Sequence, residues 1–489
     1  MAFLTEAANR GSISTGYDID YSLKLEPDNS ESLTYTGTQS SAGNAKTWTW
    51  SGWIKRTELD AHTYLFSAGY TGFQFMGTEN WLRLELYNGS TTYYLDLDMV
   101  FRDTSAWYHI VGQVDTTQAT AADRVKIWIN GVLQTEFRAS TNYTNISQNA
   151  EFQIGKTGSS ANWLKVGDWY AGGRYLAAYI AEWHYTDGVA NDADAFGEFD
   201  DDTNIWKPIE YKGSYGTNGY YLDFSDSANL GDDANGSFSF TEGNITAADQ
   251  ATDTPTNNFC TVRPMWTPHE AACSLLEGAT VWKINMPSGS GFQPNTSAIS
   301  TFQFNSGKWY WETTWTNDGD RSVLGIVSSL SDIEQTVDPD RYIWWDGGHI
   351  PWNFSGSGSN DLAPPNYDSN NTIGIALDMD NDRIAFSKDG GWLDSSGNTS
   401  DSSPGYFYSW SSTTFLSHAK ANGNVAAFFG INTNANTVAP THNINFGGYA
   451  ATIRTSGGNS DANGYGNFAY SVPSGFYAAC TKNLAEYGG

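Results

Sequence analysis

Apolar and polar residues alternate along much of the chain, most clearly between Trp107 and Leu133. A period of two is typical of a β-strand with one buried face. Asn130-Gly131 ends the second half of this stretch, and that dipeptide favours the positive φ angles of a tight hairpin turn. The pattern therefore predicts a β-hairpin. The residues that would face a core are Tyr108, Ile110 and Val114 on the first strand, and Val125, Ile127 and Ile129 on the second.

The same pattern recurs in residues 372–391. Ile373, Ile375 and Leu377 alternate with polar or small residues before an Asp-Asn-Asp turn, and Asp389-Gly390 supplies the next turn. Each hairpin would lie at the centre of its own β-sandwich. The sequence therefore predicts an all-β protein of two antiparallel β-sandwich domains, of the jelly-roll or concanavalin A-like kind.

The alternation stops between the two blocks. Residues 226–265 are rich in Asp, Asn, Gly, Ser and Thr, a composition typical of a linker, and their acidity would keep that linker extended. We therefore expect four parts in chain order. They are an N-terminal arm (1–20), a first sandwich (21–225), an acidic linker (226–265) and a second sandwich (266–489).

One short helix is expected at the start of the second sandwich. Thr267-Pro268-His269-Glu270 has the spacing of a capping box with proline at the first helical position. Gly278 can end the helix. These signals place it at about residues 268–277.

The charge of the chain narrows its partners. Of 489 residues, 54 are acidic and 25 basic, which gives a net charge of −29. Such a surface repels a phosphate backbone, and no window has the roughly 18 apolar residues of a membrane span. We therefore expect neither nucleic-acid binding nor membrane insertion. Three cysteines are too few for a disulfide framework, and the first residues lack the features of a secretory signal, so synthesis in a reducing cytosol is expected.

Two families share motifs with the chain. The Trp107-Tyr-His-Ile-Val run and the hairpin ending in Asn130-Gly131 resemble laminin-G/concanavalin A-like lectin domains over about residues 20–225. Gly307-Lys-Trp-Tyr-Trp-Glu312, Ser322–Ile326 and Ile373–Asp378 resemble SPRY (B30.2-like) domains over about residues 280–480. Both resemblances imply two-sheet antiparallel sandwiches.

The order of these two domains and the amino-acid sequence of residues 100–120 resemble those of virion proteins of tailed bacteriophages, especially marine ones. The resemblance implies a protein made in the cytoplasm of a bacterial host and then carried on the virion surface. It implies other virion proteins as partners, a homo-oligomer, and host-surface polysaccharide as a further partner.

Catalytic motifs are missing or incomplete. A glycoside hydrolase on this scaffold would resemble the family with a Glu-x-Asp-x-Glu strand, whose alternate carboxylates serve as nucleophile and acid. The runs Glu58–His62 and Glu198–Asp202 both lack the last glutamate, and chance neighbours in so acidic a chain account for them. His269-Glu270-Ala-Ala-Cys273 lacks the second histidine of a zinc-protease helix. The sequence therefore predicts no enzyme.

Two aromatic segments have the composition of a glycan-binding loop. Carbohydrate recognition needs exposed aromatic rings beside polar groups that bind sugar hydroxyls. The other interpretation of each segment is that its rings anchor the loop or contact another subunit. The candidates are Trp344, Trp345, Asp346, His349 and Trp352 in one segment, and Trp163, Asp168, Trp169 and Tyr170 in the other.

No cofactor is required by this account, although the laminin-G resemblance implies calcium in the first domain, with Asp115 as a candidate ligand. The first hypothesis is a non-enzymatic virion surface protein (a tail fibre, head fibre or capsid decoration) that binds host glycans or neighbouring virion proteins. One alternative is a polysaccharide-degrading enzyme on a lectin-like scaffold. The other is a purely architectural virion protein with no glycan ligand.

Overall fold

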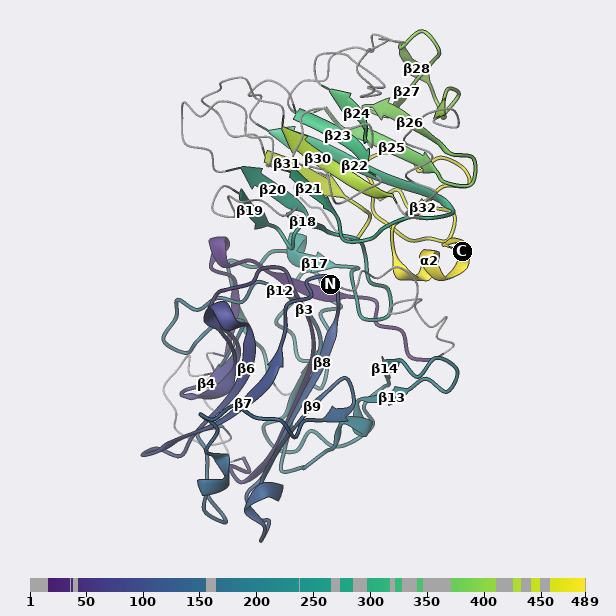
Figure 1. Ribbon diagram of the computed structural model, residues 1–489. Helices are drawn as coiled ribbons and strands as arrows, with labels where there is room; N and C mark the ends of the chain where they lie inside the picture. Colours follow the sequence, from purple (N-terminus) through teal and green to yellow (C-terminus); the bar gives the residue numbers. More distant parts are fainter. Residues whose placement is uncertain are drawn as a thin grey trace. The chain divides into compact units, whose positions relative to one another are not determined.

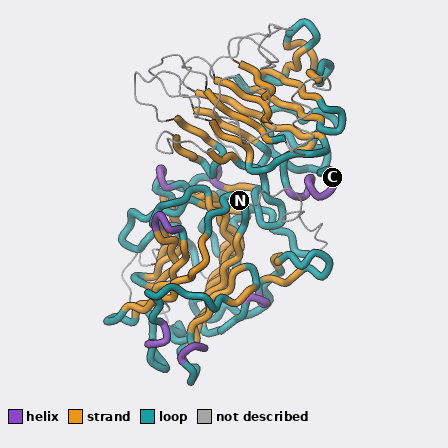
Figure 2. Tube along the Cα trace, viewed as in Figure 1, coloured by secondary structure: helices purple, strands orange, loops and turns teal. Residues whose placement is uncertain are grey.

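The computed structural model describes residues 16–35, 37, 43–154, 164–236, 238–264, 273–284, 297–316, 322–327, 341–345, 371–409, 425–431, 441–448 and 458–488. The chain divides into two compact units between Asn257 and Asn258. Strands dominate both units, and the described helices are short (Figures 1 and 2). Nearly all strand pairs are antiparallel, which confirms the predicted all-β fold.

The first unit has two large sheets, which form separate layers in Figure 1. In the described residues the first sheet has the order β10 (Val132–Leu133), β9 (Val125–Ile129), β8 (Tyr108–Asp115), β3 (Thr47–Arg56), β12 (Ala178–Asp187), β1 (Ser22–Leu25), β17 (Gln250–Ala251), with β15 (Tyr220–Leu222) also paired to β12. The second has the order β16 (Thr241–Gly243), β2 (Ser32–Tyr35), β11 (Leu164–Val166), β4 (Thr63–Ala68), β5 (Thr71–Met76), β6 (Trp81–Tyr87), β7 (Thr92–Val100). A small sheet pairs β13 (Gly197–Phe199) with β14 (Trp206–Pro208).

Short 3-10 turns connect these strands. They are η1 (Pro27–Asn29), η2 (Gly77–Glu79), η3 (Ala121–Asp123), η4 (Tyr143–Asn145), η5 (Ala193–Ala195) and η6 (Ala247–Asp249).

The core of the first unit lies between its two sheets. Trp50 on β3 packs edge-on against Trp183 on β12, with ring centroids 4.8 Å apart. All six residues that the first hairpin was predicted to bury belong to this core. The hairpin itself is confirmed as β8 and β9, with Asn130 and Gly131 at φ angles of 47° and 76°. Alternation thus decided which side of each strand meets the core.

The predicted acidic linker is wrong. Residues 226–257 fold into the first unit, because β16 pairs with β2 and β17 pairs with β1. Phe238 and Phe240 are buried against Tyr220 and extend the core. The polar residues around them form turns: the Asp233 carboxylate accepts hydrogen bonds from three backbone N–H groups. A few buried rings therefore outweigh a polar composition.

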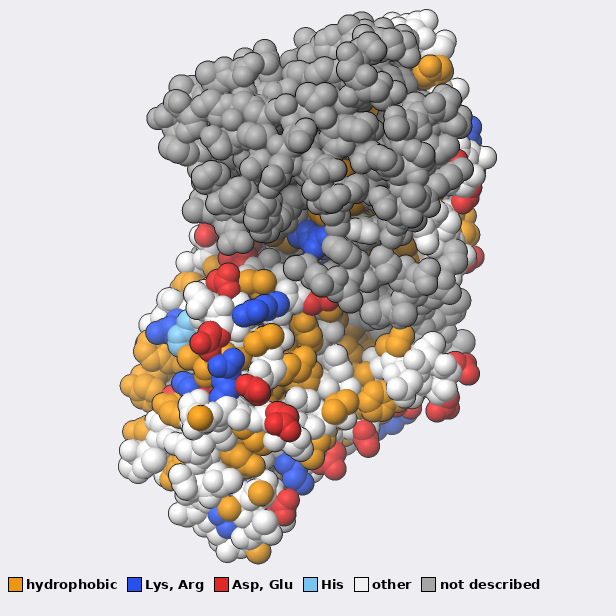
Figure 3. All heavy atoms as spheres, viewed as in Figure 1, with side chains coloured by type: hydrophobic (Ala, Val, Ile, Leu, Met, Phe, Trp, Pro, Cys, Tyr) orange, Lys and Arg blue, Asp and Glu red, His pale blue; other side chains and the backbone are white. Residues whose placement is uncertain are grey.

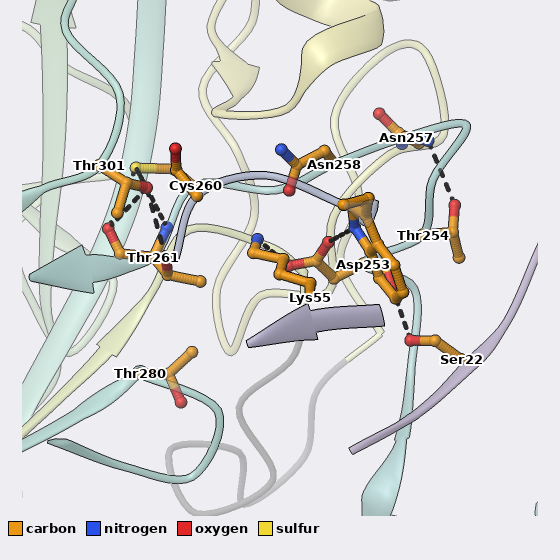
Figure 4. A network of polar contacts seen from close by, with 12 residues as sticks. Ser22, Lys55, Asp253, Thr254, Asn257, Asn258, Cys260, Thr261, Thr280 and Thr301 are labelled. Carbon is orange, nitrogen blue, oxygen red and sulfur yellow. Dashed lines mark hydrogen bonds and ion pairs between the residues drawn. The ribbon is translucent and has the colours of Figure 1, made fainter. Parts of the chain in front are cut away.

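A buried ion pair holds the end of this segment. The Lys55 ammonium lies 2.7 Å from the Asp253 carboxylate, and the Trp107 indole N–H donates to the other oxygen at 3.1 Å. The Ser22 hydroxyl donates to the Asp253 carbonyl at 2.6 Å (Figure 4). Removing one partner of such a pair leaves a buried charge without compensation, which typically costs about 3–5 kcal/mol.

The expected N-terminal arm is described only from residue 16. This part packs on the first unit: the Tyr17 hydroxyl donates to Glu182 at 2.9 Å, and the Ile19 N–H donates to the Thr256 hydroxyl at 3.0 Å. Residues 1–15 lie outside the described residues.

The second unit also has two sheets. In the described residues the smaller has the order β18 (Val262–Pro264), β21 (Ser297–Ser300), β30 (Ala426–Ile431), β23 (Ser322–Val327), β24 (Arg341–Trp345). The larger has the order β19 (Cys273–Leu276), β20 (Val281–Ile284), β31 (Thr441–Asn445), β22 (Lys308–Thr316), β25 (Ile373–Asp378), β26 (Arg383–Lys388), β27 (Gly391–Leu393), β28 (Thr399–Asp401). β29 (Tyr408–Ser409) pairs with β26, and β32 (Tyr477–Ala478) runs parallel to β22. α2 (Thr481–Tyr487) follows β32.

The second predicted hairpin is confirmed as β25 and β26, and Ile373, Ile375 and Leu377 are buried in the core of this unit. The helix expected at 268–277 is wrong in its second half, because Cys273–Leu276 is a strand paired with β20. Glu277, Gly278 and Ala279 have positive φ angles and form the turn. Pairing with β20 supplies the backbone hydrogen bonds that a helix would have supplied. Residues 265–272 lie outside the described residues.

Candidate functional site

The loop after β11 carries three of the predicted glycan-binding residues. Asp168 is fully buried: one carboxylate oxygen accepts from the Lys165 ammonium at 2.9 Å, and the other accepts from the Arg174 N–H at 3.0 Å. The Ser67 hydroxyl on β4 donates to the Asp168 carbonyl at 3.1 Å. Gly172 and Gly173 have φ angles of 83° and 85°, which let the chain turn back tightly. Asp168 therefore holds the loop in place.

This loop presents aromatic rings on the outer side of the second sheet. The Trp169 ring stacks on Tyr64 of β4, with centroids 6.3 Å apart and planes at 26°, and meets Tyr170 edge-on at 5.0 Å. Tyr70 meets Tyr87 and Tyr170 edge-on at 5.1 and 5.0 Å. We call these five residues the Trp169 cluster. Tyr70 is 43 % exposed, and Trp169, Tyr170 and Tyr87 are half-buried.

Tyr70 is held outward by the turn between β4 and β5. Gly69 has a φ angle of 59°, and a Cβ atom there would collide with the side chain of Gln153. The same Gln153 oxygen accepts a hydrogen bond from the Tyr70 N–H at 2.8 Å. The exposed Tyr70 ring therefore lies on a turn that the Gln153 side chain holds in place.

A row of hydrogen-bonded polar side chains runs beside the cluster. We call Arg174, His62, Gln74 and Glu85 the polar row. The Arg174 guanidinium donates to Nδ1 of His62, and the His62 ring meets Gln74 Oε1 at 2.5 Å. Gln74 Nε2 donates to Oε2 of Glu85 at 2.6 Å. Because arginine only donates, Nδ1 of a neutral His62 is the acceptor and its Nε2 carries the proton.

Glu85 keeps one oxygen free. Its Oε2 also accepts from the Tyr64 hydroxyl at 3.1 Å, whereas its Oε1 has no hydrogen-bond partner among the described residues. Burial raises the pKa of the Glu85 carboxyl above its usual range. Burial, together with the nearby Arg174 guanidinium, lowers the pKa of the His62 imidazole. Charged and apolar atoms intermingle on the first unit in Figure 3, where a histidine borders Lys or Arg side chains.

The structure brings Asp168, Trp169 and Tyr170 together, but not all predicted residues can be placed. Trp163, Asp346, His349 and Trp352 lie outside the described residues. Trp344 and Trp345 were expected in a loop, which is wrong, because they end strand β24 and pair with Leu324 and Val323. Tyr and Trp favour strands, and the β23 partner outweighs the nearby glycines.

Sequence reasoning missed most of this face. The missed residues are His62, Tyr64, Tyr70, Gln74, Glu85, Tyr87 and Arg174. One signal was present: on β6, Leu82, Leu84 and Leu86 face the core, so the residues between them face outward. The neighbours across the sheet could not be inferred, since they depend on the pairing of β4, β5 and β6.

Asp115, the candidate calcium ligand, initiates the loop after β8. Its carboxylate accepts from the Thr117 N–H at 3.1 Å, the Thr117 hydroxyl at 2.6 Å and the Gln118 amide at 2.5 Å. Within the described part of the chain, no group of three or more His, Cys, Asp or Glu side chains could hold a metal ion. Calcium at Asp115 stays a prediction.

One buried pair has the outline of a serine–histidine dyad. Ser51 Oγ lies 2.8 Å from His109 Nε2, and the Trp206 indole N–H donates to His109 Nδ1 at 3.0 Å. Burial lowers the pKa of His109 to about 3, so the ring is neutral near pH 7. Because Nδ1 accepts, Nε2 carries the proton and donates to Ser51. This histidine therefore cannot take the serine proton, and the pair is structural.

Two family matches agree with the fold. Residues 28–194 match the concanavalin A-like lectin/glucanases superfamily, and residues 308–437 match the SPRY domain. The chain thus carries a concanavalin A-like domain followed by a SPRY domain, as the sequence motifs implied. No curated protein matches the chain. No helix in the described ranges is long and apolar enough to cross a membrane.

Several solved structures are similar to parts of this chain. A candidate carbohydrate-binding protein of Bacteroides ovatus is 13 % identical, with a TM-score of 0.33, and the match covers 46 % of this chain and 58 % of that one, less than two thirds. A SAP-like pentraxin of Limulus polyphemus is 14 % identical, with a TM-score of 0.28 and coverage of 47 % and 98 %. The SPRY domain of human HERC1 is 14 % identical, with a TM-score of 0.24 and coverage of 35 % and 91 %.

Proposed function

We propose that this protein is a non-enzymatic carbohydrate-binding protein of a bacteriophage virion surface, and that the Trp169 cluster with the polar row is its glycan-binding face. The lectin-like fold of the first unit supports the carbohydrate-binding part. The virion part rests on the resemblance of the domain order and of residues 100–120 to tailed-phage proteins.

One observation carries the proposal: the exposed Tyr70 ring and the half-buried Trp169 ring lie on the same face as polar atoms for which the described residues provide no partner. Sugar rings present apolar C–H faces that pack on aromatic rings, and hydroxyls that need hydrogen-bond partners. Trp169 and Tyr70 offer the first kind of contact. Glu85 Oε1 offers an acceptor, and the half-buried Arg174 guanidinium offers donors.

The carboxylates of this face favour binding over hydrolysis. Hydrolysis of a glycosidic bond generally uses two carboxyl groups with separate roles. Asp168 is buried and paired with Lys165, and Asp96 is buried and paired with Arg83 at 2.7 Å. Among the described residues of the face, Glu85 is the carboxylate that no cation contacts directly. A single such carboxylate suits recognition of a hydroxyl.

The test is glycan binding by the full-length protein and by Trp169→Ala. We expect binding to bacterial surface polysaccharides on a glycan array, and at least a tenfold loss in Trp169→Ala, since stacked aromatic anchors dominate such sites. Phe199→Ala is the control, because Phe199 is an exposed ring of the same unit that lies on the small sheet and packs on Trp206.

Other outcomes separate the alternatives. Depolymerisation of a bound polysaccharide by the purified protein would establish the polysaccharide-degrading enzyme. Absence of binding to any surface glycan, with assembly onto other virion proteins, would establish the architectural role. Equal loss of binding in Phe199→Ala and Trp169→Ala would remove the Trp169 cluster as the site.

A further inference from the structure

The cations on and beside the proposed glycan-binding face are not equivalent. Lys165 is neutralised by Asp168, at 2.9 Å. Arg83 is neutralised by Asp96 through two hydrogen bonds, at 2.7 and 2.8 Å. Arg174 has no carboxylate partner among the described residues. Its guanidinium donates to the neutral ring of His62 instead. In the described part of this face, Arg174 is therefore a cation without a counter-ion.

Arg174 is placed where a ligand on the aromatic rings would meet it. Its guanidinium carbon lies 5.8 Å from the centroid of the Trp169 ring. Its backbone N–H is fixed by Asp168 and its carbonyl accepts from the Tyr64 N–H at 3.1 Å, so the residue is held at both ends. The side chain is half-buried, which lowers the cost of ordering it on a ligand.

A second arginine of the same unit gives a comparison for Arg174. Arg138 lies 4.9 Å from the centroid of the Trp81 ring, as Arg174 lies over Trp169, but it is paired with Glu79 at 2.7 Å. Both sites place an arginine beside a tryptophan ring. In the described residues, a carboxylate pairs with Arg138 but not with Arg174.

We propose that the missing carboxylate belongs to the ligand, so that the site takes an acidic glycan whose carboxylate or sulfate group binds Arg174. A planar guanidinium binds either group through paired charge-assisted hydrogen bonds. Glu85 Oε1 accepts a hydroxyl of the same glycan, while Trp169 and Tyr70 contact its ring face. This inference rests on the proposed glycan-binding function and names the chemical class of its ligand.

The test compares ligands of matched length on the full-length protein by isothermal titration calorimetry. The probes are a carboxylated oligosaccharide (oligogalacturonate), a sulfated one (an oligocarrageenan) and a neutral one (an oligosaccharide of laminarin). We expect at least one acidic probe to bind tenfold or more tighter than the neutral probe, with affinity falling as salt rises. Comparison of the two acidic probes distinguishes carboxylate from sulfate.

Variants then locate the charge. Arg174→Gln should lose tenfold or more in affinity for the acidic probe and less than threefold for the neutral one, whereas Arg174→Lys should retain an intermediate affinity. Arg138→Gln, the matched control, should bind the acidic probe as the unchanged protein does. Thermal unfolding of each variant shows that it is folded.

Two results would overturn the inference, and they differ in what they say of the proposed function. If the neutral probe binds as tightly as the acidic ones, and binding is lost in Trp169→Ala but not in Arg174→Gln, the acidic class is wrong and the glycan-binding face stands. If no probe binds and a glycan array shows no other ligand, both the acidic class and the glycan-binding function are wrong.

Discussion

The polar row has a fixed direction, because its first member can only donate. Arg174 donates to His62, which fixes the proton of a neutral imidazole on Nε2 and turns the Gln74 carbonyl towards it. The Gln74 amide then donates to Glu85. One oxygen of that carboxylate is used, and the other remains available. A ligand thus meets donors at one end of the row and an acceptor at the other.

This arrangement makes binding depend on pH. His62 has a lowered pKa and is neutral at pH 7, and Glu85 has a raised pKa. Acidification protonates Glu85 at a higher pH than an ordinary glutamate, which removes negative charge, and protonates His62 only at a lower pH than an ordinary histidine, which adds positive charge. We therefore expect affinity for an acidic glycan to rise as the pH falls, for as long as the acid groups of the glycan itself stay ionised.

Titration calorimetry at several pH values and in two buffers of different ionisation enthalpy measures both the affinity and the protons taken up. Glu85→Gln should flatten the profile. An affinity that falls on acidification would contradict the role given to these two groups.

Asp168 anchors the loop that carries the Trp169 and Tyr170 rings. Asp168→Asn removes the charge that pairs with Lys165 and weakens the bond to the Arg174 N–H. We expect the free energy of unfolding to fall by about 1–3 kcal/mol and glycan affinity to fall as well, although the side chain is buried. Denaturant unfolding and glycan binding measure the two effects.

The control is Asp253→Asn, which alters a buried Lys–Asp pair on the other sheet of the same unit. It should destabilise the protein and leave glycan affinity unchanged. If Asp168→Asn also leaves affinity unchanged, the loop does not depend on this anchor.

Among the secondary-structure elements, the alternation of apolar and polar residues predicted the strands well, but it predicted the domain boundaries poorly. β8 and β9 follow directly from which positions are apolar, because one face of each strand must be buried. The prediction of a linker was wrong for residues 226–257 because these residues include few apolar side chains. The partners of the segment, such as Tyr220 and β2, are distant in sequence. The prediction of the site was incomplete for the same reason. Trp169 could be recognised in the sequence as an aromatic loop residue, but the polar row from His62 to Glu85 depends on the pairing of β4, β5 and β6.

The corrected boundary can be tested with two fragments. A fragment of residues 16–257 should unfold cooperatively, whereas one of residues 16–225 lacks β16, β17 and the buried Leu230, Phe238 and Phe240. Each such side chain contributes about 1.5–3 kcal/mol when buried, so the shorter fragment should unfold at much lower urea concentration or fail to fold. Circular dichroism against urea measures this. Equal midpoints would show that residues 226–257 are dispensable.

At the scale of the whole molecule, the chain joins a concanavalin A-like domain to a SPRY domain and carries a net charge of −29. Binding domains on one chain generally gain most when several copies act together, because each further contact is then intramolecular. As part of the virion proposal we expect the full chain to be a homo-oligomer. Light scattering after size-exclusion chromatography measures its mass, and a monomer at micromolar concentration would contradict this expectation.

A structure of the protein with an acidic oligosaccharide would show whether a glycan binds on the Trp169 cluster. We predict a sugar ring against Trp169 and Tyr70, with its acidic group within hydrogen-bonding distance of the Arg174 guanidinium and a hydroxyl donating to Glu85 Oε1. An oligosaccharide bound elsewhere, for instance on the segment that holds Trp344 and Trp352, with the Trp169 cluster left unoccupied, would contradict it.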